Sequence, residues 1–147
     1  MFILTLDSND PFFNLSAEEY FLCEKDEDFF LLWQNEPCIV IGRNQNAADE
    51  INGDYVSTRS LPVVRRITGG GAVYHDRGNL NFSFVINGEA DRVELCRPII
   101  DVMRSKYQIH KTIACPYLFY NFRLLHHAST KPDHHIRILF FLAVQVS

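Results

Sequence analysis

The fold is decided by the stretch Arg65-Arg66-Ile67-Thr68-Gly69-Gly70-Gly71-Ala72-Val73-Tyr74-His75-Asp76-Arg77-Gly78-Asn79. Two arginines end one apolar run, three glycines follow, and a second apolar run leads into a Gly-Asn turn. Glycine inside a helix or strand costs roughly 0.5–1 kcal/mol relative to alanine. Three in a row therefore indicate backbone that approaches another group closely or adopts a positive φ. The neighbouring cations favour an anion, such as phosphate or carboxylate. A glycine-rich hairpin with surface arginines is the alternative.

The composition indicates one soluble globular domain. The chain has 147 residues, of which 47% are hydrophobic and 22% charged, and twelve are phenylalanine. A net charge of −4 excludes a broad basic surface, so nucleic acid is not expected as the main partner. Any anion site is therefore local.

The cysteines and the apolar segments indicate a cytoplasmic protein without a membrane span. There is no Cys-x-x-Cys pair and no secretory leader is indicated, so we expect reduced thiols rather than disulfides or a zinc site. The longest apolar run, residues 138–144, is too short to span a bilayer. The four widely separated thiols are Cys23, Cys38, Cys96 and Cys115.

Before the glycines, the pattern predicts strands, one long helix and a short helix. The long helix starts after the turn at residues 7–11, with Ser16 and Glu19 at capping-box spacing, or with Asn14 or Asp10 as an earlier cap. We expect its amphipathic face to include Leu15, Glu18, Glu19 and Leu22. The pair Glu18 and Glu19 could serve as acid–base catalysts, but the helix dipole alone explains acidic residues in the first turn and is preferred. The expected strands cover residues 2–6, 29–33, 38–42 and 62–66, with a short helix at 47–51 and an ambiguous segment at 55–60.

After the glycines, strands are expected at residues 72–76 and 80–86. The second alternates with period two, which places Leu80, Phe82, Phe84 and Ile86 inward, and Asn81 and Ser83 outward. A helix is expected over residues 92–107. Pro98 fits it only if the helix effectively begins near Arg97 or is kinked.

Several other side chains have both a functional and a structural interpretation. The loop with Arg43 and Asn46 follows a buried strand, so it could join Arg66 and the glycines in one anionic crevice, or be an ordinary surface loop. His75 could orient a ligand or have a structural role. A buried thiol is preferred to a nucleophile for Cys115. Solvated histidines are preferred to a metal site for the pairs at 126–127 and 134–135.

Several ordered motifs resemble the lipoate–protein ligase family. They are Gly42-Arg43-x-Gln45-Asn46, the stretch from Arg65 to Asn79, Asp10-Pro11-x-x-Asn14-Leu15-x-x-Glu18-Glu19, and Leu32-Trp33-Gln34. The resemblance runs from about residue 3 to about residue 110. It implies an α+β catalytic domain like that of biotin protein ligases, with a mixed, largely antiparallel sheet and flanking helices.

The resemblance also implies a reaction. Lipoate attacks the α-phosphate of ATP, accompanied by Mg²⁺, to give lipoyl-adenylate. A lysine amine then displaces AMP, on a lipoyl-acceptor domain of a 2-oxoacid dehydrogenase complex or on the glycine-cleavage H protein. Arg66 would contact the acyl-phosphate, Thr68 would support the loop, and Asn79 would orient the adenylate. The resemblance implies no metal ligand. The substrate- and nucleotide-binding residues that it implies are Arg43, Arg66, Thr68, Gly69, Gly70, Gly71, Ala72, Val73, Tyr74, His75 and Asn79.

The chain departs from the family after about Ile113. Neither the family's Gly-Arg-Asn-Asp segment nor its Lys-x-Ser-Gly segment occurs, and Lys106, Lys111 and Lys131 lack the matching neighbours. We expect a ligase part at 1–111 and a divergent tail at 112–147, as a frameshift or truncation would produce. Activity of the chain alone is then doubtful. The other hypotheses are an octanoyl or lipoyl acyltransferase that uses a cysteine, and a non-catalytic module that binds lipoyl-adenylate or an acceptor domain.

Overall fold

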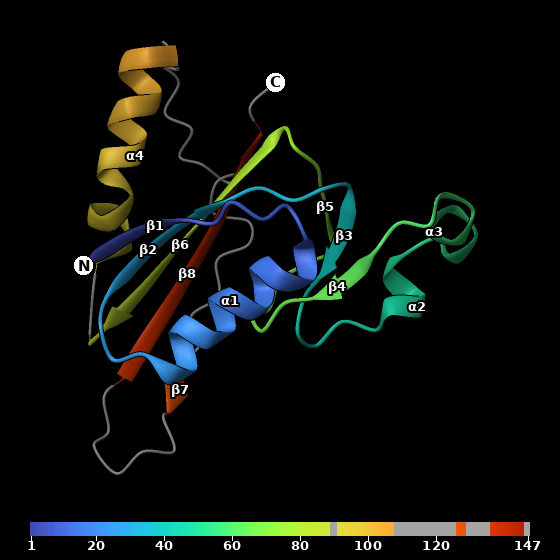
Figure 1. Cartoon of the computed structure of the whole chain (residues 1–147), viewed down its shortest axis with the longest axis horizontal. Helices are drawn as coiled ribbons and strands as arrows, with labels where there is room; N and C mark the ends of the chain where they lie inside the picture. The colour runs from blue at the N-terminus through green and yellow to red at the C-terminus, as the bar shows by residue number, and fades with distance from the viewer. Residues whose placement is uncertain (89–90, 108–125, 129–135, 146–147) are drawn as a thin grey trace.

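A computed structural model describes residues 1–88, 91–107, 126–128 and 136–145, which form two sheets with helices around them (Figure 1). The elements follow the predicted order, and the ambiguous segment at 55–60 lies mainly in a helix. Their bounds are β1 Phe2–Thr5, α1 Pro11–Glu24, β2 Phe29–Trp33, β3 Cys38–Ile41, α2 Ala47–Glu50, α3 Gly53–Arg59, β4 Val63–Arg65, β5 Val73–His75, β6 Asn79–Asn87, α4 Arg92–Tyr107, β7 His126–Ala128 and β8 Ile136–Gln145.

The larger sheet has the strand order β1-β2-β6-β8-β7. Only β1 and β2 pair in parallel, and α1 connects them, since a parallel pair needs a crossover. The other neighbours are antiparallel. Figure 1 shows α1 lying across one face of this sheet. The predicted class, a mixed and largely antiparallel sheet with flanking helices, is confirmed.

The smaller sheet has the order β4-β3-β5 and carries the predicted glycine loop between two of its strands. Strand β3 pairs in parallel with β4 and antiparallel with β5. The short helices α2 and α3 lie between β3 and β4, on the side away from the larger sheet (Figure 1). Strands β2 and β3, though consecutive, therefore belong to different sheets.

Helix α1 begins at Pro11 because Asp10 caps it. The Asp10 carboxylate accepts a hydrogen bond from the Phe12 amide at 2.8 Å, and proline suits the first helical position. The predicted capping box at Ser16 and Glu19 is wrong, since both residues lie inside the helix. Glu19 is exposed, so its predicted place on the buried face is also wrong. The side chains buried by α1 are Pro11, Asn14, Leu15, Glu18 and Leu22.

Strand β6 is buried on both faces. Phe82, Phe84 and Ile86 pack with Cys96 of α4, as the alternation predicted. Asn81 and Ser83 lie on the opposite face, yet each is 0% exposed. The prediction that they face outward is therefore wrong, because α1 covers that face, where its Glu18 accepts a hydrogen bond from Ser83. The alternation predicted the strand, whereas the burial of its second face depends on tertiary packing.

Helix α4 is capped by Asp91, whose carboxylate accepts from the Glu94 amide at 3.3 Å. The alternative start near Arg97 is wrong, because the helix runs from Arg92 with Pro98 inside it. No described helix is both long and apolar enough to cross a membrane.

Strand β8 lies within the expected tail and pairs with β6 from Asn79–Gln145 to Asn87–Arg137. The expected division at residues 111 and 112 stays a prediction. Cys115 and the histidine pair at 134–135 fall outside the described residues.

Candidate functional site

The glycine loop wraps around the side chain of Arg66, which is 1% exposed. The guanidinium donates from Nε and Nη2 to the Gly69 carbonyl at 3.1 and 2.9 Å, and from Nη2 to the Gly71 carbonyl at 2.8 Å. Its Nη1 donates to the carbonyl of Val40 at 3.2 Å. Gly70, between these acceptors, has φ 103°, which glycine adopts without strain. One buried cation thus organises the loop and attaches it to β3.

Arg66 was predicted to contact an acyl-phosphate, and this role stays a prediction. Burial lowers the pKa of Arg66, and the nearby Glu18 opposes the shift. Arginine stays charged in proteins even so. The fixed positive charge lies behind the glycine backbone, where it can stabilise an anion placed against the loop.

A second loop, the turn Gly42–Gln45, is packed against the glycine loop. The Arg43 amide donates to the Thr68 carbonyl at 2.8 Å. A side chain on Gly42 would overlap the Gly70 carbonyl oxygen, so only glycine fits there. The structure therefore brings the two predicted loops together. The Arg43 side chain is exposed, and its role in binding a ligand stays a prediction.

Asn46, which the sequence placed with Arg43, has a local structural role. Its side chain caps α2 by accepting from the Ala48 amide at 3.3 Å, and it donates to Asp49 at 2.8 Å.

The end of the glycine loop is open. Gly71 is exposed, and a Cβ atom added to it would meet no atom within 4 Å. The following residues enter β5, where Tyr74 is 52% exposed and His75 is buried. Nothing inside the described protein requires glycine at position 71.

His75 is part of a buried polar chain that links both sheets to α1. The Asn35 amide donates to His75 Nδ1 at 3.2 Å, which fits the neutral tautomer protonated at Nε2. The Asn14 amide donates to Asn35 Oδ1 at 3.0 Å. Burial, followed by the charge of Arg66, lowers the pKa of His75 to about 4. The Trp33 ring lies beside the imidazole, with centroids 6.2 Å apart. The imidazole is therefore neutral at pH 7.

Glu18 is a candidate site residue that the sequence analysis explained by the helix dipole. It lies in α1 beyond the first turn and is 1% exposed, so the helix-dipole explanation is wrong. The Ser83 hydroxyl donates a short hydrogen bond to its carboxyl group. Burial raises the pKa of Glu18 to about 7, although Ser83 and Arg66 lower it. The signal was present, because Asn14 and Glu18 lie four residues apart on a face with Leu15 and Leu22.

Several buried polar atoms of α1, β6 and the glycine loop have no hydrogen-bond partner among the residues that the structure describes. Buried polar atoms are normally paired, so such atoms are candidates for contact with water or with a polar ligand. They are Asn14 Oδ1, Glu18 Oε2, Thr68 Oγ1, and Asn81 Oδ1 and Nδ2.

Asn79, predicted to orient an adenylate, closes the turn before β6. Its side-chain oxygen accepts from the Asp76 amide at 3.0 Å, and its own amide donates to the Asp76 carbonyl at 3.0 Å. The predicted role is untested.

The described cysteines are Cys23, which is half-buried, and two buried thiols. Cys38 is fully buried, and burial raises the pKa of its thiol to about 11. Cys96 is also buried. In the described part of the chain, no three His, Cys, Asp or Glu side chains gather as a metal site would require.

Comparisons with known proteins agree on one family. The family described as "Lipoyl protein ligase A/B catalytic domain" matches residues 10–113. Lipoate–protein ligase 1 of Staphylococcus aureus is 42% identical over 110 residues, which cover 71% of this chain and 34% of the relative. A Bacillus subtilis lipoate–protein ligase is 47% identical over 93 residues, covering 62% of this chain and 28% of the relative. The chain thus spans about a third of their length.

Solved structures share the fold. The lipoate complex of LipL1 from P. falciparum has a TM-score of 0.74 at 24% identity, with 98% of this chain and 47% of that chain covered. A lipoate–protein ligase A bound with ATP has a TM-score of 0.69 at 21% identity, with 98% and 66% covered.

Proposed function

Because the chain belongs to the lipoyl protein ligase A/B catalytic-domain family, we propose that it forms the lipoate- and nucleotide-binding part of a lipoate–protein ligase. The whole enzyme would couple lipoate to ATP and transfer the lipoyl group to a lysine. The observation that carries the proposal is the glycine loop, which is built around a buried arginine and has an open backbone at Gly71.

The first step forms an acyl-phosphate. A lipoate carboxylate oxygen attacks the α-phosphorus of ATP, the bond from that phosphorus to the bridging oxygen breaks, and pyrophosphate leaves. Negative charge grows on the phosphoryl oxygens. We assign the Gly71–Tyr74 backbone to contact with the nucleotide. Arg66 would supply a fixed positive charge behind that backbone, in a position that needs no rearrangement during the reaction.

The second step forms an amide. A lysine amine of an acceptor domain attacks the lipoyl carbonyl, AMP leaves with the bonding electrons, and the amine proton passes to solvent. The acceptors we propose are lipoyl domains of 2-oxoacid dehydrogenase complexes or the glycine-cleavage H protein. The solved archaeal ligase system with its E2 lipoyl domain supports this class of partner. We place the reaction in the cytoplasm, with Mg²⁺ arriving on the ATP phosphates, which are its usual ligands.

The chain itself lacks the Lys-x-Ser-Gly segment that the resemblance assigns to adenylation. We therefore propose that the 147-residue chain binds lipoyl-adenylate and forms it slowly or not at all. An acyl transfer through cysteine has less support, because the third glycine of the loop and the continuation Tyr74-His75-Asp76-x-Gly78-Asn79 resemble the ligases more than the acyltransferases.

The test separates binding from turnover. Calorimetry with lipoyl-sulfamoyl-adenosine, a non-hydrolysable mimic of lipoyl-adenylate, measures binding, and pyrophosphate release with lipoate, ATP and Mg²⁺ measures adenylation. We expect binding with turnover far below that of a full-length ligase assayed in parallel. Absence of binding would contradict the proposal. Rapid pyrophosphate release would show that the missing lysine segment is not needed.

A further inference from the structure

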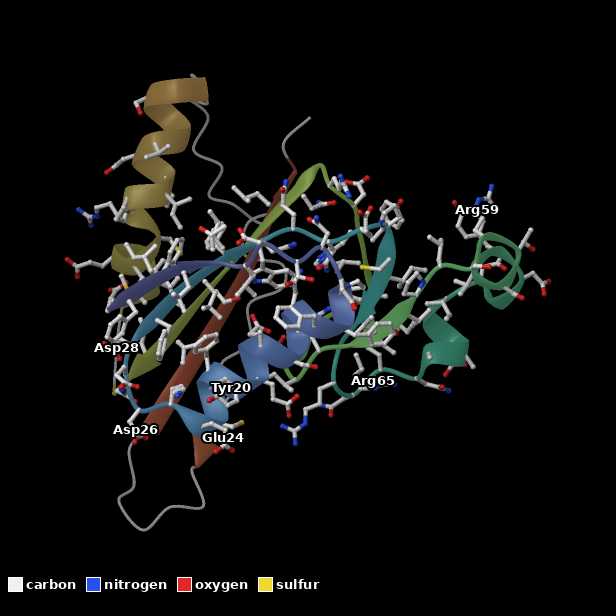
Figure 2. All side chains as sticks on the ribbon, viewed as in Figure 1. Tyr20, Glu24, Asp26, Asp28, Arg59 and Arg65 are labelled. Atoms are coloured by element: carbon white, nitrogen blue, oxygen red, sulfur yellow. The ribbon has the colours of Figure 1, made fainter. Side chains whose placement is uncertain are left out.

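The Arg65 side chain donates hydrogen bonds to three backbone carbonyls of the neighbouring turn. Its Nη1 lies 2.9 Å from the Gly42 oxygen, 3.1 Å from the Arg43 oxygen and 2.7 Å from the Gln45 oxygen. Arg65 ends β4, and Ile41, its partner in the register, ends β3. Because the two parallel strands stop together, the Arg65 side chain reaches the turn that follows β3. Figure 2 labels Arg65 beside this connection to α2.

The Gly42–Gln45 turn also has two internal hydrogen bonds. The Gln45 amide donates to the Gly42 carbonyl at 3.1 Å, and the Gly42 amide donates to the Gln45 side chain at 2.7 Å. The amide of Arg43 is directed away from Arg65 to the Thr68 carbonyl of the glycine loop. The turn therefore presents carbonyl oxygens to Arg65 and an N–H group to the glycine loop.

Three carbonyl dipoles that converge on one point repel each other unless a cation lies between them. The guanidinium supplies that charge and charge-assisted hydrogen bonds. Arg65 is exposed overall, in contrast to the buried Arg66. Its removal should therefore disturb the turn far more than the global stability, because an exposed side chain contributes little burial.

We propose that Arg65 is a positioning residue, which holds the Gly42–Gln45 turn against the glycine loop and so sets the shape of the ligand site without touching the ligand. The two consecutive arginines bind different loops: Arg65 binds the carbonyls of the Gly42–Gln45 turn, and Arg66 binds those of the glycine loop. The effect on ligand binding rests on the proposed function, whereas the effect on the turn does not.

The test uses Arg65→Met, which removes the donors but keeps the stem, and Arg65→Lys, whose ammonium can still donate to several carbonyls. Arg59→Met is the matched control. Arg59 is another exposed arginine, stacked over Tyr55 at 3.9 Å on α3, far from Arg65 in Figure 2. Amide hydrogen exchange of the whole chain follows the Arg43 amide. Calorimetry with lipoyl-sulfamoyl-adenosine follows the site, and urea unfolding follows stability.

We expect Arg65→Met to speed exchange of the Arg43 amide about tenfold or more and to weaken binding of the mimic about tenfold, with a nearly unchanged urea midpoint. Arg65→Lys should recover most of both losses, and Arg59→Met should match the wild type. Unchanged exchange in Arg65→Met would overturn the proposal. Faster exchange with wild-type affinity would overturn the positioning role. A wild type that fails to bind the mimic refutes the proposed function, and the exchange result then still decides whether Arg65 holds the turn.

Discussion

Gly42 and Gly70 lie so close that a methyl group on Gly42 would overlap the Gly70 carbonyl oxygen. The contact joins the turn after β3 to the glycine loop before β5. Both loops come from the smaller sheet, and their close packing leaves space for backbone only.

Gly42→Ala should therefore destabilise the protein by about 2–3 kcal/mol, as overpacking of a rigid contact does. Urea unfolding followed by circular dichroism measures the loss. Gly53→Ala is the control, because a Cβ at Gly53 meets no atom within 4 Å and the residue begins α3. Its stability should be equal to the wild type or higher by up to ~1 kcal/mol. Equal stability of the two variants would show that the loops move apart freely.

Gly71→Ala should leave stability within about 0.5 kcal/mol of the wild type, since the added methyl group meets no protein atom. The same methyl group should weaken binding of lipoyl-sulfamoyl-adenosine at least tenfold, if the ligand lies against this backbone. Calorimetry measures the affinity, and urea unfolding measures the stability. Wild-type affinity would place the ligand elsewhere.

Replacing Arg66 should be far more damaging than replacing an exposed arginine. Arg66→Met leaves the carbonyls of Val40, Gly69 and Gly71 without this donor and should cost about 3 kcal/mol or more. Arg66→Lys, with one compact ammonium group, should fall between Met and the wild type. Thermal and urea unfolding provide the comparison, with Arg59→Met expected within about 1 kcal/mol of the wild type. Near-normal stability of Arg66→Met would contradict the organising role of the guanidinium.

The pH dependence of stability should show two opposed contributions. The pKa of Glu18 is raised from 4.5 to about 7 in the folded protein, so its contribution is complete below pH 4.5 and is lost as the pH rises through 7. The pKa of His75 is lowered from 6.5 to about 4, so its contribution is complete above pH 6.5 and is lost as the pH falls through 4. At ~1.4 kcal/mol per pKa unit, each amounts to roughly 3 kcal/mol.

Between pH 4.5 and 6.5 the two contributions should largely cancel in the wild type. Glu18→Gln should remove the opposing contribution and leave that of His75, so the free energy of unfolding should decrease as the pH is lowered from 6.5 to 4. His75→Gln should show the opposite slope, with stability decreasing from pH 4.5 to 7. Urea unfolding at half-unit pH intervals measures all three proteins. Parallel curves for the wild type and both variants would exclude this pair as the source of the pH dependence.

The order of elements could be predicted because it follows from local patterns. The apolar run Phe29–Trp33 is β2 over the same residues, and Asp10 was among the predicted caps. Helix α3 was ambiguous because its cap, Asn52, was not recognised. The Asn52 side chain accepts from the Tyr55 amide at 3.0 Å.

The candidate site was only half predictable. Arg66 and the glycines were found from their unusual composition, but the carbonyls that bind Arg66 depend on how the loop folds. The helical spacing places Glu18 on the buried face of α1, but its partner Ser83 lies 65 residues away in the sequence. Their contact exists because α1 crosses the polar face of β6, which only tertiary packing decides.

The position of Trp33 makes it an intrinsic fluorescent probe of the candidate site. It is the single tryptophan of the sequence, it is 1% exposed, and its ring lies beside His75 in the hydrophobic core that includes Val40 of β3. All indole emission therefore originates from this one place, without the background that several tryptophans would add. A change in its wavelength or lifetime would report entry of water, titration of the imidazole or arrival of a ligand, in the unlabelled protein and in real time.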